Sequence, residues 1–250
     1  MRFIALLSGG KDSIYNLMLS KKDGHHLVAV VNLKTGEEKD SYMYQYVGNN
    51  VVPGIAEALE VPLETIVTQG MSYNRAMPYV ATKDDEVEDL FIGLSALKQK
   101  YEFSGVAVGA IKSQYQYCRV ADVCQRLGLV VLAYLWQREQ KELLTEMVGA
   151  GLSSIVVKAG EEPLVGLVGQ DISQVLVKYA DFVAGQIDKY PSLKPEDFNM
   201  CGEGGEYETL TLDCPLFKQK IVPTATRLSV DSRGTTSFII DEYKLVPKLG

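Results

Sequence analysis

Several features that would place this chain in a specialised class of protein are missing from its sequence. It has only four cysteines, at positions 118, 124, 201 and 214, and none of them forms a Cys-x-x-Cys pair. The two histidines, His25 and His26, are adjacent, so the ligand spacing of a zinc site is absent as well. We therefore expect free thiols and neither a disulfide framework nor a zinc centre.

The sequence also lacks a long apolar run and an excess of basic residues. Its longest apolar stretch, residues 127–136, is too short to span a bilayer, and no signal peptide is evident. The net charge of −7 argues against a general nucleic-acid surface, which needs clustered lysine and arginine. We expect a cytoplasmic protein with no membrane and no direct nucleic-acid partner; the sequence does not set the oligomeric state.

Apolar and amphipathic segments alternate through the first half of the chain. This alternation predicts βαβ units and an α/β fold with a Rossmann-like parallel sheet, covered by helices on both faces. Such sheets bind ligands at the carboxyl ends of their strands. Strands are predicted at 2–7, 27–33, 63–67, 106–108 and 129–133, and helices after residue 13 and at 48–59, 84–100 and 113–127.

The pattern changes in the second half, which is rich in short β-type runs after Pro195. We therefore predict a domain boundary near residue 134, with an α/β domain at 1–133 and a smaller α+β domain at 134–250. In the second domain, helices are predicted at 138–149 and 172–187, a loop at 161–169, and strands at 154–158, 209–212, 216–222, 227–230 and 237–245.

The segment Ser-Gly-Gly-Lys-Asp-Ser joins the first predicted strand to the first predicted helix. Gly9 and Gly10 can turn backbone N–H groups inward to bind an anion, and the positive end of the helix points at the same place. Ser8 and Ser13 add hydroxyl donors, and Lys11 adds a positive charge for phosphate oxygens. The spacing differs from a Walker loop and from G-x-G-x-x-G.

An acid stands inside this phosphate-binding pattern. Asp12 would repel phosphate unless it held a magnesium ion or oriented a substrate, so the loop predicts a metal-assisted reaction with Mg²⁺ at Asp12. The structural alternative is a simple strand-to-helix turn capped by serine or aspartate.

A second polar segment begins at Gly109, where the fourth predicted strand ends. Gly109 would permit close approach of a ligand, and Ser113 is a plausible helix N-cap. Gln116 and Arg119 share a helix face, and Tyr115 lies one turn before Arg119. Taken alone, this pattern also fits an ordinary amphipathic helix with a polar exposed face.

A third segment, residues 201–209, reads Cys-Gly-Glu-Gly-Gly-Glu-Tyr-Glu-Thr. If its second half is extended, Glu206 and Glu208 face one way and Tyr207 the other. Paired acids can act as a base, bind ammonium or hold a metal. An acidic turn before a strand is the alternative, but three carboxylates at a glycine bend favour a functional role.

Together these segments resemble the diphthine–ammonia ligase (diphthamide synthetase) family. The first of them resembles the PP-loop of the N-type ATP pyrophosphatases, or adenine nucleotide alpha hydrolases, whose fold is a HUP-type Rossmann-like sheet. The acidic segment is the most specific to the family. Similar stretches lie at 8–13, 41–45, 85–90, 109–116, 119–120, 127–129, 135–138, 201–209 and 212–217, together with Gln140. Tyr117 departs from the family pattern, which usually has a basic residue there, and Asn49 stands where a histidine is usual.

The resemblance implies ATP-dependent amidation of diphthine on translation elongation factor 2. In such a reaction the diphthine carboxylate attacks the α-phosphorus of ATP, pyrophosphate leaves, and ammonia then displaces AMP from the acyl-adenylate. It implies ATP and Mg²⁺ as cofactors, and it implies ammonium and the diphthine-bearing elongation factor as partners. Positioned donors in the PP-loop would stabilise the departing pyrophosphate.

The resemblance also implies roles for residues of this sequence. The nucleotide-binding residues would be Ser8, Gly9, Gly10, Lys11, Asp12, Ser13, Asn32, Leu33, Met43 and Gly109. The catalytic residues would be Asp12, Arg119, Glu203, Glu206 and Glu208. The substrate-binding residues would be Lys112, Ser113, Tyr115, Gln116, Trp136, Arg138, Gly204, Gly205, Tyr207 and Thr209.

Two other functions share the PP-loop. A tRNA-modifying PP-loop pyrophosphatase that inserts sulfur needs a paired cysteine system, and Cys118 and Cys124 are not a convincing pair. A non-catalytic nucleotide-binding sensor would have no need for bases close to phosphate, so the clustered carboxylates argue against it.

Overall fold

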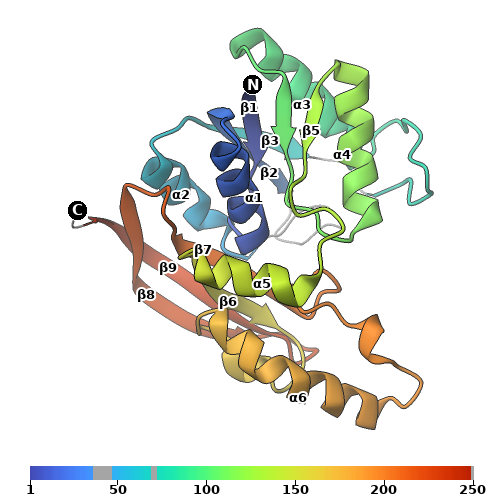
Figure 1. Cartoon of the computed structure of the whole chain (residues 1–250), viewed down its shortest axis with the longest axis vertical. Coiled ribbons are helices and arrows are strands. Elements are labelled where there is room, and N and C mark those ends of the chain that lie inside the picture. Colours follow the sequence, from blue (N-terminus) through green and yellow to red (C-terminus); the bar gives the residue numbers. More distant parts are fainter. Residues whose placement is uncertain (36–46, 69–71, 249–250) are drawn as a thin grey trace. The chain divides into compact units, whose positions relative to one another are not determined.

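The structure is a computed structural model that describes residues 1–35, 47–68 and 72–248. The chain divides into two compact units, Met1–Trp136 and Gln137–Gly250 (Figure 1).

The first unit is a five-stranded parallel sheet with strand order β3-β2-β1-β4-β5. The Rossmann-like α/β class predicted from the alternating pattern is therefore confirmed. Its strands are β1 (Arg2–Leu6), β2 (His26–Thr35), β3 (Leu63–Thr68), β4 (Gly105–Ala107) and β5 (Val130–Leu132). Its helices are α1 (Lys11–Lys22), α2 (Val52–Leu59), α3 (Glu86–Lys100) and α4 (Gln114–Leu127).

The direction of the strand order reverses at the centre of this sheet. From β1 the chain continues to β2 and β3 on one side, and β4 and β5 then follow on the other side of β1. With this order, the rule that parallel crossovers are right-handed puts α1 and α2 on one face and α3 and α4 on the opposite face. Leu90, Leu94, Val120 and Val123 on α3 and α4 are fully buried in one core cluster with Ile4. Ligands of such sheets bind where the order reverses, at the carboxyl ends of β1 and β4.

The ends of the helices follow local capping rules. The Asp85 side chain accepts a hydrogen bond from Val87 N at the start of α3, and the Ser113 side chain accepts one from Gln116 N at the start of α4. The prediction of Ser113 as an N-cap is therefore confirmed. Gly128 ends α4 in the left-handed region, with φ of +65°.

The helix predicted at 48–59 needs a correction at its start. Gly48 has a left-handed backbone with φ of +83°, a 3₁₀ turn spans Asn49–Val51, and the α-helix begins only at Val52. Pro53 lies in the first turn of α2, where its missing N–H costs no intrahelical hydrogen bond.

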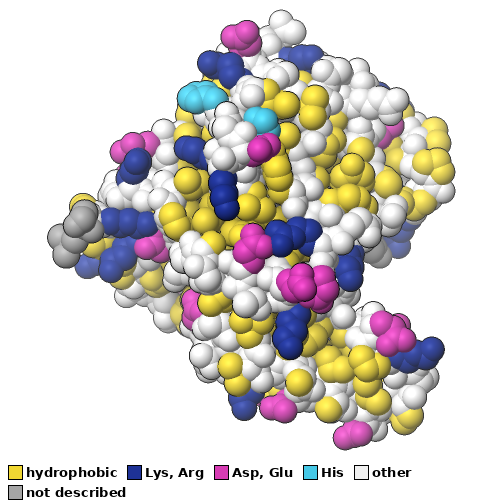
Figure 2. All heavy atoms as spheres, viewed as in Figure 1, with side chains coloured by type: hydrophobic (Ala, Val, Ile, Leu, Met, Phe, Trp, Pro, Cys, Tyr) yellow, Lys and Arg dark blue, Asp and Glu magenta, His cyan; other side chains and the backbone are white. Residues whose placement is uncertain are grey.

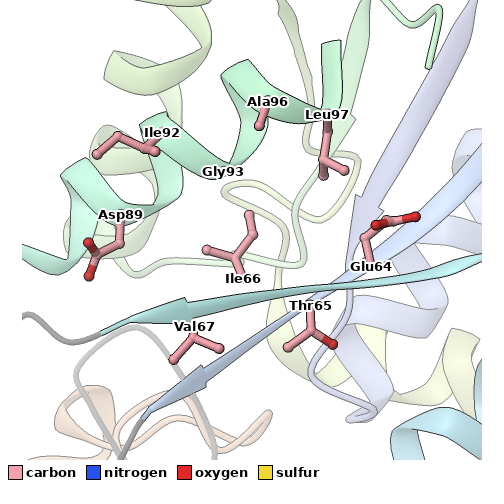
Figure 3. A pocket seen from close by; sticks show the side chains of 9 residues that line it. All are labelled: Glu64, Thr65, Ile66, Val67, Asp89, Ile92, Gly93, Ala96 and Leu97. Carbon is pink, nitrogen blue, oxygen red and sulfur yellow. The ribbon is translucent and has the colours of Figure 1, made fainter. Parts of the chain in front are cut away.

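A surface hollow of about 300 Å³ lies between β3 and α3 (Figure 3). Ile66 points toward α3, whereas Thr65 and Val67 point to the other side of the strand. Gly93 makes this packing possible, because a Cβ there would lie 2.3 Å from Ile66 Cδ1. The hollow is lined by none of the residues that the sequence predicted for the site.

The second unit is built on a four-stranded sheet of order β7-β6-β9-β8, with antiparallel pairing throughout. Two helices accompany it (Figure 1). They bury apolar side chains such as Leu143, Met147, Val175 and Phe182. The α+β architecture predicted for the second half is confirmed. The elements are α5 (Gln140–Gly149), β6 (Ser153–Ala159), α6 (Ser173–Lys189), β7 (Tyr207–Asp213), β8 (Gln219–Val230) and β9 (Thr236–Pro247).

The prediction of two separate strands, at 216–222 and 227–230, is wrong, because β8 is continuous from Gln219 to Val230. It forms a long hairpin with β9, and the register shifts between Pro223 and Thr226. Pro223 has no N–H to donate, and an irregularity of this kind lets a strand accommodate proline. The loop predicted at 161–169 also contains a 3₁₀ turn, Val165–Leu167.

Candidate active site

The turn between β1 and α1 is closed by its own hydrogen bonds. Gly9 has φ of +89°, a backbone conformation that glycine adopts at little cost. Gly10 N donates to Ser8 Oγ at 3.2 Å, and Ser13 Oγ donates to Gly10 O at 2.9 Å. The predicted strand–glycine turn–helix arrangement is present, and the N-terminus of α1 begins directly at Lys11.

Lys11 and Asp12 form a tight ion pair in this turn. Lys11 is 2 % exposed, and its Nζ donates to Asp12 Oδ2 at 2.8 Å. The other carboxylate oxygen, Oδ1, is buried without a hydrogen-bond partner in the part of the chain that the structure describes. Burial raises the pKa of Asp12, and the Lys11 charge opposes that rise. A hard oxygen ligand without a partner beside a phosphate-type turn fits a magnesium ion, whose preferred ligands are oxygens.

Gly109 lies directly against this turn. A Cβ at Gly109 would lie 2.7 Å from both Asp12 C and Ser13 N. The sequence led us to expect close approach of a ligand at Gly109, but the backbone that approaches is that of α1 itself. The glycine is thus required for packing, and its contact with the nucleotide stays a prediction.

The residues predicted at the end of β2 are buried. Asn32 is 2 % exposed and its Nδ2 donates to Leu7 O at 2.9 Å, while Oδ1 has no hydrogen-bond partner among the described residues. Leu33 is 5 % exposed. The predicted adenine contact Met43 lies outside the described residues. A buried amide oxygen without a partner beside β1 is consistent with the predicted nucleotide site.

Arg119 holds a neighbouring segment rather than projecting from its helix. It is fully buried, its NH2 donates to Asn74 O at 2.6 Å, and its NH1 donates to Tyr115 O at 3.1 Å. The guanidinium carbon lies 3.4 Å from the centre of the Tyr115 ring. Nε has no hydrogen-bond partner within the described residues. Arg119 therefore does not belong to the polar exposed face that we expected for α4. The catalytic role of Arg119 stays a prediction.

The segment that Arg119 holds, residues 72–85, is organised by side chains of its own. Asn74 N donates to Asp85 Oδ2 at 2.9 Å, and Asn74 Nδ2 donates to Val80 O and to Thr82 Oγ1. The sequence analysis did not predict this arrangement. The one sequence signal for it was an aspartate, Asp85, immediately before the helix.

Hydrophobic side chains cover parts of the first unit's surface (Figure 2). In residues 72–85 the exposed hydrophobic side chains are Tyr73, Met77 and Val80.

Tyr117, one of the departures from the family pattern, has a packing partner. Its ring stacks on Trp136 with centroids 4.1 Å apart and planes 13° from parallel. At position 117, where the resemblance led us to expect a basic residue, the aromatic ring therefore makes a stacking contact with Trp136. Among the other predicted substrate residues on or beside α4, Lys112 is exposed, and Ser113 and Gln116 are half-buried.

The acidic segment of the second unit folds around the carboxylate of Glu206. Its Oε1 accepts from Asn199 N at 2.6 Å and its Oε2 from Gly204 N at 2.9 Å. A Cβ at Gly204 would lie 2.7 Å from Glu206 Oε1, and a Cβ at Gly202 would lie 2.6 Å from Tyr207 O. Gly202, with φ of +82° and backbone in its way, is therefore required for the tight loop, whereas a side chain at Gly204 would displace the Glu206 carboxylate. Gly205, also predicted in the site, has φ of +88°.

The strand begins at Tyr207, so Glu206 belongs to the turn and not to the extended segment that we expected. Glu208, on β7, is opposite Lys158 on β6, and Lys158 Nζ donates to Glu208 Oε1 at 3.0 Å. Tyr207 is buried and donates from its hydroxyl to Met200 O at 2.6 Å. The carboxylate of Glu206 is therefore bound by backbone N–H groups, and that of Glu208 by the Lys158 ammonium group. Glu203 is half-buried, and Thr209 is buried.

Gln140, a position that carries the family resemblance, supports the acidic segment through contacts that the sequence did not predict. It is 6 % exposed, its Nε2 donates to Asn199 Oδ1, and its Oε1 accepts from Cys201 N, both at 2.8 Å. A glutamine at the first position of a helix gives no sequence signal of this contact. The predicted substrate residue Arg138, close to Gln140 in sequence, forms an ion pair with Glu146.

All four cysteines are free, as expected. Among the described residues, no three or more histidine, cysteine or acidic side chains cluster as metal ligands. No helix in the described ranges is long and apolar enough to cross a membrane.

The fold and the turn define an α/β protein of the Rossmann-like class, with a phosphate-type glycine turn at the switch point of its sheet and a second α+β unit. Two family models match this chain: the diphthamide synthase N-terminal domain at residues 1–131 and the diphthamide synthase C-terminal domain at residues 141–244. The chain belongs to the diphthamide synthase family.

Curated relatives agree with this assignment. A diphthine–ammonia ligase of Rattus norvegicus is 44% identical over 240 residues, covering 93% of this chain and 86% of the relative. The Homo sapiens protein of the same name is 43% identical with the same coverage. A solved structure described as a predicted subunit of a tRNA methyltransferase from Methanocaldococcus jannaschii is 16% identical, over 61% of this chain and 77% of that chain. Its TM-score of 0.38 is too low to support an inference.

Proposed function

We propose that this protein catalyses ATP-dependent amidation of diphthine by ammonium, releasing AMP and pyrophosphate. The observation that carries the proposal is that both domains of the diphthamide synthase family match in one chain, which includes the glycine turn and the loop around Glu206. The protein that bears the diphthine would be translation elongation factor 2, and the second unit would bind it, in the cytoplasm.

A carboxylate needs activation before ammonia can attack it. In the proposed reaction the diphthine carboxylate attacks the α-phosphorus of ATP, an acyl–phosphate bond forms, and the bond to pyrophosphate breaks. Ammonium loses a proton, the resulting ammonia attacks the acyl carbon, and AMP leaves as the amide forms with loss of a second proton. The N-terminus of α1, the Ser8 and Ser13 hydroxyls and Lys11 would stabilise negative charge on the departing pyrophosphate.

A magnesium ion fits beside Asp12. The Oδ1 atom of Asp12 is buried without a partner among the described residues, and its Oδ2 already binds Lys11. When bound, the ion would supply positive charge to the phosphate oxygens. Asp12 would hold it, and Lys11 would remain available to balance charge in the same turn.

The loop around Glu206 would bind ammonium. Its carboxylate accepts two backbone N–H bonds, which set its orientation before any substrate arrives. A carboxylate has about four acceptor positions, so it retains capacity for a cationic donor. Glu203 and Glu208 would add negative charge to this unit and help accept the protons that ammonium releases.

The direct test combines the purified chain with ATP, Mg²⁺, ammonium chloride and elongation factor bearing diphthine. We expect AMP release that requires both ammonium and the diphthine-bearing factor, with the amide detected on the factor by mass spectrometry. Elongation factor without diphthine is the matched control. AMP formation that depends on tRNA would instead support a tRNA-modifying enzyme, and tight ATP binding without turnover would support a sensor.

A further inference from the structure

Gln140 is a buried polar side chain at the start of a helix. It is the first residue of α5 and is only 6 % exposed, although glutamine usually lies at the surface. Both ends of its amide are used, because Oε1 accepts from Cys201 N and Nε2 donates to Asn199 Oδ1, each at 2.8 Å. Cys201 Sγ also donates to the Gln140 carbonyl oxygen at 3.4 Å. Gln140 therefore holds the start of the loop at residues 199–206, which surrounds the Glu206 carboxylate.

These contacts fix which way two amide side chains point. A backbone N–H can only donate, so the Gln140 atom that faces Cys201 N is the carbonyl oxygen Oε1. The NH₂ group of Gln140 then faces Asn199, which must present its own carbonyl oxygen Oδ1. The Nδ2 donor of Asn199 is consequently turned away from Gln140.

Asn199 Nδ2 and the Glu206 carboxylate lie on the same side of the loop. A Cβ on Gly204 would lie 2.8 Å from Asn199 Nδ2, 2.7 Å from Glu206 Oε1 and 2.9 Å from Glu206 Oε2, so all three atoms surround one point. The backbone of Asn199 also contacts this carboxylate, because Asn199 N donates to Glu206 Oε1 at 2.6 Å. Asn199 thus presents donors toward the carboxylate while Gln140 binds its acceptor.

We propose that Gln140 is a positioning residue for amidation, which acts through Asn199 to hold the Glu206 carboxylate in the orientation that binds ammonium. Without the Gln140 amide, the Asn199 side chain is free to turn over, and its Oδ1 would then repel the carboxylate. A binding group must be held within about 0.5 Å of its working position by the residues behind it. This inference rests on the proposed function, because Glu206 is the ammonium ligand of that reaction.

Two substitutions separate the two ends of the Gln140 amide. Gln140→Met keeps an unbranched side chain but removes both hydrogen bonds. Gln140→Glu keeps an acceptor for Cys201 N but has no donor for Asn199 Oδ1. Both variants should raise KM for ammonium about tenfold, the lower end of the range for partners that orient a metal ligand. Gln174→Met, at an exposed glutamine in the first turn of α6, is the matched control and should leave this KM unchanged.

The first step of the reaction is the internal reference. Exchange of labelled pyrophosphate into ATP, measured with the diphthine-bearing factor and without ammonium, reports adenylate formation alone. In both Gln140 variants we expect the rate of this exchange and KM for ATP to stay within about twofold of wild type. Equal losses in pyrophosphate exchange and in ammonium-dependent amide formation would indicate a general support of the fold and overturn the positioning role.

A double-mutant cycle tests whether Asn199 carries the effect. Asn199→Ala keeps the backbone N–H that binds Glu206 but removes the acceptor for Gln140. Gln140→Met combined with Asn199→Ala should raise KM for ammonium little more than the larger single change, whereas independent effects would multiply to about a hundredfold. Multiplied effects, or an unchanged KM for ammonium in Gln140→Met, would overturn the proposal.

Hydrogen exchange gives a measurement that does not require activity. Exchange in residues 199–206 should increase in Gln140→Met and stay at the wild-type level in Gln174→Met. Unchanged hydrogen exchange in Gln140→Met would overturn the anchoring by Gln140, whether or not the enzyme is active. Wild type without any factor-dependent pyrophosphate exchange would count against the proposed function instead.

Discussion

Gly109 and Ser13 are in such close contact that a Cβ on Gly109 would lie 2.7 Å from the backbone nitrogen of Ser13. The loop after β4 therefore rests on the first turn of α1, which follows β1. These are the two strands between which the sheet changes direction. Two segments that are far apart in sequence thus meet at one ligand-binding edge of the sheet.

Gly109→Ala should displace the start of α1 and weaken ATP binding. The added methyl group would meet the backbone of Asp12 and Ser13, which cannot move aside as a flexible side chain does. Overpacking of this kind costs about 1–3 kcal/mol, so we expect a roughly 5- to 150-fold loss of ATP affinity by calorimetry and a lower thermal midpoint.

Gly185→Ala is the control for this change. Gly185 lies in α6, and a Cβ there would meet no atom within 4 Å. Alanine in a helix interior is better than glycine by roughly 0.5–1 kcal/mol, so this variant should be as stable as wild type or more so. Wild-type ATP affinity in Gly109→Ala would show that the contact with α1 is not needed for nucleotide binding.

Asp12→Asn should remove the effect of magnesium on ATP binding. The variant keeps the size of the side chain but loses the charge of the Oδ1 atom that we assign to the ion. Titration calorimetry with and without Mg²⁺ should show stronger ATP binding with the ion in wild type and no difference in Asp12→Asn. A difference of wild-type size in the variant would place magnesium elsewhere.

Glu206→Gln should abolish amide formation. The glutamine NH₂ would face one of the backbone donors that now binds a carboxylate oxygen, either Asn199 N or Gly204 N. The negative charge for ammonium would be lost, and the unsatisfied donor would reduce stability by about 1–3 kcal/mol. The assay is mass spectrometry of the elongation factor together with the thermal midpoint.

Glu161→Gln is the matched control for Glu206, because Glu161 forms an ion pair with Lys189 in which both side chains are about half exposed. Exposed pairs contribute little, so this variant should keep both activity and stability. Near-normal amide formation by Glu206→Gln would rule out the ammonium role of that carboxylate.

Arg119→Lys should loosen residues 72–85. Lysine keeps the charge, but it lacks the planar fork that reaches Asn74 O and Tyr115 O while stacking on the Tyr115 ring. Hydrogen exchange should increase in residues 72–85, and the thermal midpoint should fall.

Arg126→Lys, on the same helix and more exposed, should leave exchange in residues 72–85 unchanged. A fall in kcat of Arg119→Lys without any change in exchange would favour a direct role of Arg119 at the substrate over an anchoring role.

Thiol labelling should distinguish Cys118 from the buried Cys124 and Cys214. Burial raises the pKa of the Cys124 thiol to about 12 and that of Cys214 to about 11, while Cys118 is only half-buried. Because the thiolate is the reactive form, its fraction at pH 8 is roughly 10⁻⁴ for Cys124 and 10⁻³ for Cys214.

We therefore expect Cys118 to react first with a disulfide reagent in the folded protein, and the rates of Cys124 and Cys214 to rise about tenfold per pH unit between pH 8 and pH 10. Cys118→Ser should remove the fast phase. Fast labelling that persists in this variant would contradict the burial of the other thiols.

Sequence reasoning succeeded where a short segment contains its own explanation. The strand, glycine turn and helix around Gly9 depend on residues within a few positions of each other, and Ser113 caps the helix that it precedes. The prediction of strand boundaries failed at Pro223, because proline weakens the local signal for a strand. In the structure, β8 pairs with β9 on both sides of Pro223, so the strand is continuous there. The extent of such a strand depends on its partner.

By itself, the sequence determined the Rossmann-like class, the α+β second half and the location of the glycine turn, because hydrophobic period and backbone freedom are local properties. Only the tertiary structure decided that Arg119 is buried against Asn74 and that Gln140 hydrogen-bonds to Asn199 and Cys201 beside the loop of Glu206. Arg119 and Asn74 are 45 positions apart in sequence. Burial and hydrogen-bond partners at such separations are set by the packing of whole elements, which no segment of the chain encodes alone.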